Sequence, residues 1–176
     1  MRRAWISEAA RAALIAAAEQ SAPYETGGIL IGVLRDGDAW IVMAVEVEDP
    51  SRGRSRFAIP EGVTPAVVEI ARQCEIRFGY VGDWHSQPAD LPASPTDRST
   101  LAKSARRRRT DIQPIVLIVV RAAPDGWSVE ALCDAGSGTE AIELRLTGAL
   151  PPVEPRDDVV TDDLSQPAAS VRRRGG

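Results

Sequence analysis

Apolar and polar positions along the chain follow the periods of strands and helices as far as about residue 150. Two almost wholly apolar runs, at residues 29–34 and 115–120, are typical of strands buried on both faces. The turn at residues 36–38 joins the first run to an apolar segment at residues 39–47, which predicts a β-hairpin. Shorter apolar segments predict further strands at residues 57–59, 80–84, 127–133 and 140–146.

Three segments instead carry apolar residues at the three- and four-residue spacing of an amphipathic helix. Ser7 is a suitable N-cap for a helix that ends near residue 19. Thr64-Pro65 predicts the start of a second helix, because proline is favoured at the first helical position. A third helix follows Ser94 and ends near Arg109. Hairpins that alternate with crossover helices predict an α/β domain with helices packed on a mixed sheet.

The composition divides the chain into a folded part and a tail. Hydrophobic residues make up 44% and charged residues 26% of the sequence, which fits one globular domain over residues 1–150. Beyond residue 150, prolines, acidic residues and serines dominate and the apolar periodicity stops. Residues 151–176 are therefore expected to form a mostly disordered tail.

Charge and cysteine content exclude several classes of protein. The net charge of −4 gives no reason to expect affinity for nucleic acid or for an anionic membrane. No apolar run reaches the roughly 18 residues of a membrane span. Cys74 and Cys133 lie in apolar patterns far apart in the sequence, which predicts reduced core thiols of a cytoplasmic protein instead of a disulfide framework.

The residues that can carry chemistry gather in two segments. His85, the only histidine, follows a predicted strand at the start of a loop, and Asp97 comes one short loop later. Imidazole and carboxylate groups are both good zinc ligands. Glu25 precedes the first apolar strand and can accept a proton from water, and Ser94 can donate a hydrogen bond to an oxyanion. These are the parts that hydrolysis at zinc requires.

Each of these residues also has a structural interpretation. Ser94 and Asp97, with proline beside the serine, form a capping box that is normal at a helix start and compatible with a functional role. A single histidine such as His85 is more often structural than catalytic. Glu25, just before two glycines, can be a solvated loop residue. Taken one at a time, the residues leave both interpretations open.

In combination, the segments resemble the JAB/MPN metalloprotease family in its prokaryotic branch. The pattern of that family is a glutamate, then a His-Ser/Thr-His-Pro segment, then a serine followed three residues later by an aspartate. Residues 25–32, Glu-Thr-Gly-Gly-Ile-Leu-Ile-Gly, are similar to the glutamate segment. Residues 84–88, Trp-His-Ser-Gln-Pro, and residues 94–97, Ser-Pro-Thr-Asp, are similar to the other two.

The resemblance implies a zinc site on a three-layer α/β core of cytidine-deaminase-like layout, with helices packed on a mixed central β-sheet. It also implies isopeptidase activity after the C-terminal glycine of a ubiquitin-like protein in a bacterial conjugation-type system. Activating or conjugating enzymes are further implied partners. Carried over by position, Glu25 is the general base, His85 and Asp97 are zinc ligands, and Ser94 polarises the substrate carbonyl.

Three neighbours of His85 complete the expected site. Trp84 and Ser86 are expected to contact the substrate. Gln87 stands where the family has a second histidine and is the expected third zinc ligand, but an amide oxygen binds zinc more weakly than imidazole. Two interpretations follow. The protein is a zinc isopeptidase, or it is a catalytically weakened module of the same fold that binds a ubiquitin-like protein or a conjugating enzyme without cleaving it.

Two basic features lie outside this pattern. Arg106 to Arg109 are interpreted as a solvated helix end favoured by the helix dipole, in preference to a dock for an acidic partner. Residues 172–176, Arg-Arg-Arg-Gly-Gly, are similar to the C-terminus of ubiquitin-like modifiers. The domain before them does not resemble such a modifier, so a tail without that role is the preferred interpretation.

Overall fold

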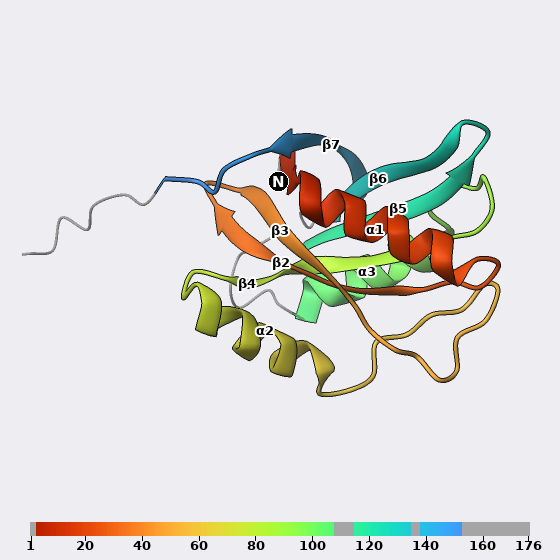
Figure 1. Ribbon diagram of the computed structural model, residues 1–176, viewed down its shortest axis with the longest axis horizontal. Helices are drawn as coiled ribbons and strands as arrows, with labels where there is room; N and C mark the ends of the chain where they lie inside the picture. The colour runs from red at the N-terminus through yellow and green to blue at the C-terminus, as the bar shows by residue number, and fades with distance from the viewer. Residues whose placement is uncertain (1–2, 108–114, 135–137, 153–176) are drawn as a thin grey trace, which may run out of the picture.

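The computed structural model describes residues 3–107, 115–134 and 138–152, except for the side chains of residues 105–107. The side chains of the arginine run at 106–109 and the predicted tail beyond residue 152 therefore lie outside the described part. Within that part, seven strands and three helices are present (Figure 1). The strands are β1 (Arg3–Ser7), β2 (Gly27–Arg35), β3 (Asp38–Glu46), β4 (Gly79–Gln87), β5 (Ile115–Ala123), β6 (Gly126–Asp134) and β7 (Thr139–Thr147), and the helices are α1 (Glu8–Ser21), α2 (Val63–Cys74) and α3 (Pro95–Arg107).

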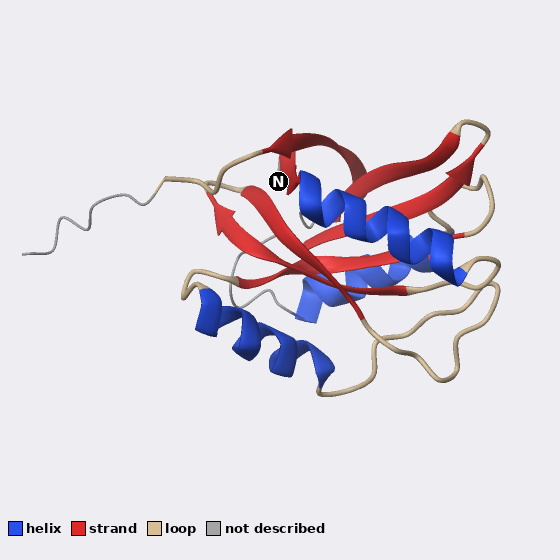
Figure 2. Ribbon diagram, in the orientation of Figure 1, coloured by secondary structure: helices blue, strands red, loops and turns tan. Residues whose placement is uncertain are grey.

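The seven strands form a closed barrel in the order β1-β3-β2-β4-β5-β6-β7. The predicted three-layer arrangement, with helices packed on a central sheet, is therefore wrong. Closure depends on β1, which pairs in parallel with β3 on one side and with β7 on the other. The β4–β5 pair is also parallel, and the remaining neighbours are antiparallel, so the barrel is mixed. Figure 2 shows how strands dominate the molecule.

The strand that closes the barrel is the one that the sequence pattern did not predict. β1 has five residues, and only its second and fourth are buried, which is too short a pattern to recognise. Its outward-facing Trp5 stacks on Trp40 of β3 with ring centroids 6.2 Å apart. The guanidinium groups of Arg3 and Arg145 lie 5.8 and 5.6 Å from the Trp5 ring. Cross-strand aromatic and cation–π contacts of this kind stabilise the pairing where apolar burial is small.

The helices cover the two faces of the barrel wall differently. α1 packs through Leu14 into the largest apolar cluster, which it shares with inward-facing residues such as Leu30, Trp84 and Ile118. α2 packs on the other face of β2 and β4, and α3 packs on the other face of β5. In Figure 1, β2 and β4 run between α1 and α2. No helix in the described part of the chain has the length and apolar character needed to cross a bilayer.

Several local predictions can be compared directly with the structure. The helix start at Ser7 is confirmed, since its hydroxyl accepts a hydrogen bond from the Ala10 N–H at 3.0 Å. The hairpin of β2 and β3 is confirmed as well. Residues 57–59, predicted as a strand, belong to a loop instead. Both cysteines are free, but only Cys133 is the predicted core residue, because Cys74 is exposed at the end of α2.

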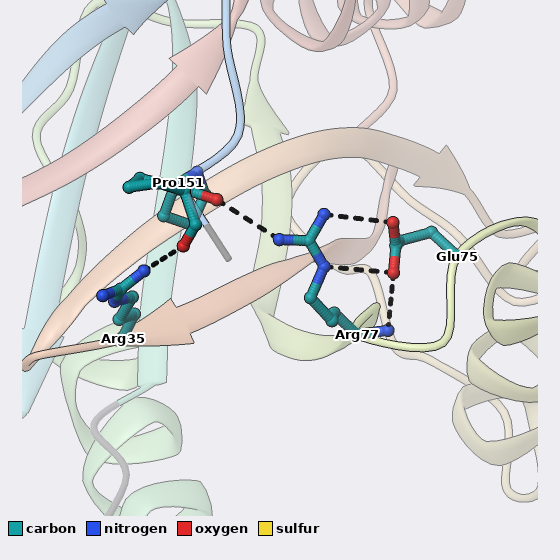
Figure 3. Close-up of polar contacts among 5 residues, drawn as sticks. Arg35, Glu75, Arg77 and Pro151 are labelled. Carbon is teal, nitrogen blue, oxygen red and sulfur yellow. Dashed lines mark hydrogen bonds and ion pairs between the residues drawn. The ribbon is translucent and has the colours of Figure 1, made fainter. Parts of the chain in front are cut away.

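The chain is still in contact with the folded part at residues 151 and 152 (Figure 3). Pro151 is buried, and its carbonyl accepts a hydrogen bond from Arg77 Nη1 at 3.2 Å. The Pro152 carbonyl accepts one from Arg35. Glu75 holds Arg77 in place by accepting from its Nε and Nη2 at 3.1 and 3.0 Å. The contacts of the folded part therefore extend to Pro152.

A chain that ends after Leu150 is accordingly expected to be less stable than one that ends after Pro152. The shorter chain loses both carbonyl acceptors and the apolar contact of the buried Pro151. Each kcal/mol lost lowers the Tm of a domain of this size by roughly 2–4 °C. Thermal unfolding of the two truncated chains beside the full chain measures the difference. Equal Tm values would show that the contacts at positions 151 and 152 contribute nothing to stability.

Candidate functional site

β4 sorts its side chains onto two faces, because neighbouring residues in a strand point in opposite directions. Asp83 and His85 line a cavity against α3, and Gln87 donates a hydrogen bond to Asp97 of that helix. Trp84 and Ser86 point the other way and are 1% and 0% exposed. Pairing of β4 with β2 and β5 holds this row of side chains in register.

Glu25 reaches the same region because it comes two residues before β2, which is paired with the end of β4. Its backbone is fixed from two sides. The Glu25 N–H donates to the Gly53 carbonyl at 2.9 Å. The next residue, Thr26, is tied to β4, since its N–H donates to Ser86 Oγ at 3.0 Å and its carbonyl accepts from the Ser86 N–H at 2.7 Å.

α3 begins with the predicted capping box. The Asp97 N–H donates to Ser94 Oγ at 3.2 Å, and the Ser94 N–H donates to Asp97 Oδ2 at 2.7 Å. Gln87 Nε2 donates to the same carboxylate oxygen at 3.2 Å. The Ser94 N–H and Gln87 Nε2 both donate to Asp97 Oδ2, so Asp97 Oδ1 is left to face His85. The Ser94 hydroxyl accepts in this cap and also stabilises the ionised form of the Asp97 carboxylate.

A cavity of about 500 Å³ lies between α3, the loop at residues 55–59 and the outward face of β4. Glu25, His85 and Asp97 all line it, although Glu25 is far from the other two in the sequence. Ser94 and Gln87 are connected to it through their hydrogen bonds to Asp97. The structure therefore brings Glu25, the expected base, to the same site as His85 and Asp97, the two expected ligands.

The atoms that could hold a metal ion are His85 Nε2, Asp97 Oδ1 and Gln87 Oε1. His85 Nε2 is 3.6 Å from Asp97 Oδ1, which is too long for a hydrogen bond. His85 Nε2 and Gln87 Oε1 are both buried and have no hydrogen-bond partner among the described residues. Two ligand atoms of a tetrahedral zinc ion with bonds of about 2.0–2.2 Å lie roughly 3.3–3.6 Å apart, so the imidazole and carboxylate are spaced as such ligands.

The donor set nevertheless differs from a full zinc site. The part of the chain that the structure describes contains no group of three His, Cys, Asp or Glu side chains suited to a metal. His85 and Asp97 therefore need Gln87 as a third donor. Its amide now points Nε2 at Asp97, and a half turn of the amide would exchange nitrogen for oxygen without moving the chain. With that exchange the amide oxygen would be turned toward Asp97, as a third donor would have to be.

Two of the carboxyl groups that line the cavity, those of Glu25 and Asp97, have pKa values shifted in opposite directions. Burial raises the pKa of Glu25, with His85 opposing the shift and Asp97 adding to it. Burial would also raise the pKa of Asp97, but the nearby His85 ring and the hydrogen bonds from Ser94 outweigh it and lower the pKa to about 2. One carboxyl group is thus suited to carry a proton and the other to stay ionised, which separates a base from a ligand.

Trp84 and Ser86 have structural roles in the described part of the chain, and their expected contact with a substrate stays a prediction. The Trp84 side chain fills the barrel core, and its Nε1 donates to the Val45 carbonyl at 3.3 Å. Ser86 is fully buried, and its hydroxyl serves the Thr26 N–H. Ser86 is absent from the lining of the cavity, whereas Trp84 is part of it. Their hydrogen bonds fix the backbone next to Glu25 and His85.

The sequence predicts a loop over residues 51–56, but not that residues 55–59 form the second wall of the cavity. Phe57 of this loop lies against the start of β2, where a Cβ on Gly27 would come within 2.5 Å of Phe57 Cε1. Glycine at position 27 therefore permits the close approach of the loop. A glycine in a strand is a signal for such an approach, but it does not say which segment makes it.

Substitution of Ser86 with alanine is expected to destabilise the protein by about 1–3 kcal/mol. The Thr26 N–H, in a residue that is 1% exposed, would lose its acceptor, and an unsatisfied buried donor costs that much. Urea unfolding measures the loss, and Ser99→Ala, at an exposed position of α3, is the matched control. If both variants unfold at the same urea concentration, the bond between Thr26 and Ser86 does not fix this part of the site.

Comparison with known proteins identifies the family of the chain. The model of a family described as prokaryotic homologs of the JAB domain matches residues 7–132. A comparison with curated proteins found no match. The solution structure of protein DSY2949 from Desulfitobacterium hafniense is similar at a TM-score of 0.62 and 15% identity, covering 84% of this chain and 94% of that one, which supports the fold alone. Because the family match spans well over half of the chain and includes Glu25, His85 and Asp97, the protein belongs to the prokaryotic JAB-domain family.

Proposed function

We propose that the protein is a zinc-dependent isopeptidase that cleaves after the C-terminal glycine of a ubiquitin-like protein in a bacterial conjugation-type system. The supporting observation is the buried His85 Nε2, without a hydrogen-bond partner among the described residues, 3.6 Å from an ionised Asp97 in a cavity that also contains Glu25. A buried imidazole nitrogen without a partner is costly unless a ligand satisfies it. The substrate class comes from the resemblance to the JAB/MPN metalloproteases.

In this proposal His85 and Asp97 would hold the zinc ion, and the Gln87 amide oxygen would be a weaker third donor. The ion would supply a Lewis acid that polarises the substrate carbonyl and acidifies a water molecule. Glu25 takes the proton of the attacking water, and its raised pKa suits it to pass that proton to the leaving amine. The low pKa of Asp97 keeps its carboxylate ionised, as a ligand must be. The Ser94 hydroxyl donates to the oxyanion.

The cavity walls define how a substrate tail enters. α3 forms one wall, with Thr96, Thr100 and Ser104 at intervals of one helical turn, and residues 55–59 form the other. An extended segment of small residues, such as a diglycine, can lie between the two walls with its carbonyl near His85. Partners of the protein are then a ubiquitin-like protein, its conjugates, and the activating or conjugating enzymes of the same system.

One observation favours a second function. The Gln87 amide donates to Asp97, so its oxygen is turned away from the carboxylate that it would share with zinc. If the amide keeps this orientation, only two ligands remain and zinc binds weakly, since catalytic sites normally have three protein ligands. The protein would then bind a ubiquitin-like protein or a conjugating enzyme without cleaving it.

Metal content and cleavage distinguish the two functions. Protein purified without chelator is analysed for zinc and then assayed with a peptide that ends in diglycine and is joined through its last carbonyl to aminocoumarin. The isopeptidase predicts close to one zinc per chain and coumarin release that a chelator abolishes. Less than about a tenth of an equivalent of any transition metal, well below the occupancy expected for tight sites, supports the binding module.

A further inference from the structure

The segment between β3 and α2 contains a carboxylate that is used entirely inside its own loop. Asp49 is 8% exposed. Its Oδ1 accepts from the N–H and the hydroxyl of Ser51, at 2.8 and 2.7 Å, and its Oδ2 accepts from the Ala58 N–H at 2.9 Å. The Ser51 bonds hold the pKa of Asp49 below its usual range. One side chain thus ties the two ends of the loop at residues 49–58 together.

The tip of this loop is in contact with the proposed base. Gly53 donates its N–H to the Arg56 carbonyl at 2.8 Å, which folds the tip back on itself. The Gly53 carbonyl then accepts from the Glu25 N–H at 2.9 Å. Residues 55–59 of the same segment line the cavity that contains the Glu25 side chain. The position of the Glu25 backbone therefore depends on the shape of the loop.

We propose that Asp49 is a positioning residue for Glu25, acting through the loop at residues 49–58 and the Gly53 carbonyl. The backbone around Glu25 is then held by two separate sets of hydrogen bonds. Thr26, its neighbour, is tied to the rigid β4 through Ser86, whereas Glu25 itself is tied to a loop whose closure depends on Asp49. The catalytic part of this inference rests on the proposed function, but the positioning part does not.

Hydrogen exchange of two neighbouring amides tests the positioning part without any substrate. Asp49→Asn keeps the size of the side chain but offers one acceptor oxygen for two ends of the loop, so one end is released. The Glu25 amide is expected to exchange at least about tenfold faster than in the parent, while the Thr26 amide, held by Ser86, stays within about twofold. Asp125→Asn, in the exposed turn between β5 and β6, is the matched control and should change neither amide.

Three results would overturn the positioning role. They are an unchanged Glu25 amide, equal acceleration of both amides, which indicates general loosening, and an effect of the control as large as that of Asp49→Asn. Should Asp49→Asn fail to fold, Ser51→Ala removes a single hydrogen bond and is expected to give the same pattern at smaller size.

Kinetics on the diglycine–aminocoumarin peptide test the catalytic part. Asp49→Asn is expected to lower kcat by about ten- to a hundredfold with zinc content unchanged, because a small displacement of a base is that costly. Combined with Glu25→Gln it should add no further loss, since it acts through Glu25. Full additivity of the two losses would overturn the role. If the parent does not cleave the peptide at all, the proposed isopeptidase function fails, and the exchange result alone decides the positioning role.

Discussion

Replacing Glu25 with glutamine is expected to lower kcat for cleavage after diglycine by about 10²–10⁴-fold, the usual contribution of a general base. The variant keeps the size of the side chain and the N–H bond to Gly53, so the loop and the cavity are expected to persist. Zinc content should not change, because His85 and Asp97 are untouched. The measurement is single-substrate kinetics on the diglycine–aminocoumarin peptide together with metal analysis of the same samples.

Glu19→Gln is the matched control for this substitution, since Glu19 is an exposed glutamate on α1. It should leave both kcat and zinc content at the parent values. A Glu25→Gln variant that retains parental kcat would remove Glu25 from the mechanism. A variant that loses zinc together with activity would instead make Glu25 a ligand.

The pH dependence of the same reaction follows from the direction of the Glu25 pKa shift. Burial raises this pKa above its ordinary value of 4.5, and the base works only when ionised. The activity should therefore fall as the pH decreases and Glu25 becomes protonated. A raised pKa also means that the folded state favours the protonated form of Glu25, so the ionised form lowers the free energy of unfolding. In the protein without zinc, above the pKa of Glu25, Glu25→Gln should thus unfold at a higher urea concentration than the parent.

The grouping of His85, Ser94 and Asp97 was predictable because these residues lie in short, specific motifs. The segment from Trp84 to Pro88 and the capping box at Ser94 and Asp97 flank one short loop, so their proximity follows from the sequence alone. The strand period also carried information that the prediction did not use. If His85 faces the cavity, then the side chains of Trp84 and Ser86 must turn toward the core, where both are buried.

The architecture was harder to predict, because it depends on contacts between distant segments. The barrel is closed by β1, whose partners β3 and β7 are joined to it in register by pairs such as Trp5 with Trp40. A five-residue strand with two buried positions has no periodic signal that distinguishes it from a helix start. The wall at residues 55–59 also depends on a contact between separated residues, because Asp49 binds both Ser51 and Ala58.

Replacing Gln87 with histidine is expected to raise zinc affinity by on the order of tenfold to a hundredfold or more. Partners that only orient a ligand already change metal affinity by about 10- to 100-fold, so an added imidazole ligand should do at least as much. Asp97 would lose the hydrogen bond from Gln87 but keep the one from the Ser94 N–H, and so keep its place at the start of α3. Competition with a chelator of known affinity measures the change.

Gln87→Leu is the matched control for this last substitution, since it keeps the approximate size of the side chain and removes both its donor and its acceptor. Zinc affinity should increase in the order leucine, glutamine, histidine if the position 87 side chain contributes a ligand. If histidine binds zinc no better than glutamine, position 87 lies outside the coordination sphere. His85 and Asp97 would then be the only protein ligands of the proposed site, and the binding module without cleavage would become the better account of the protein.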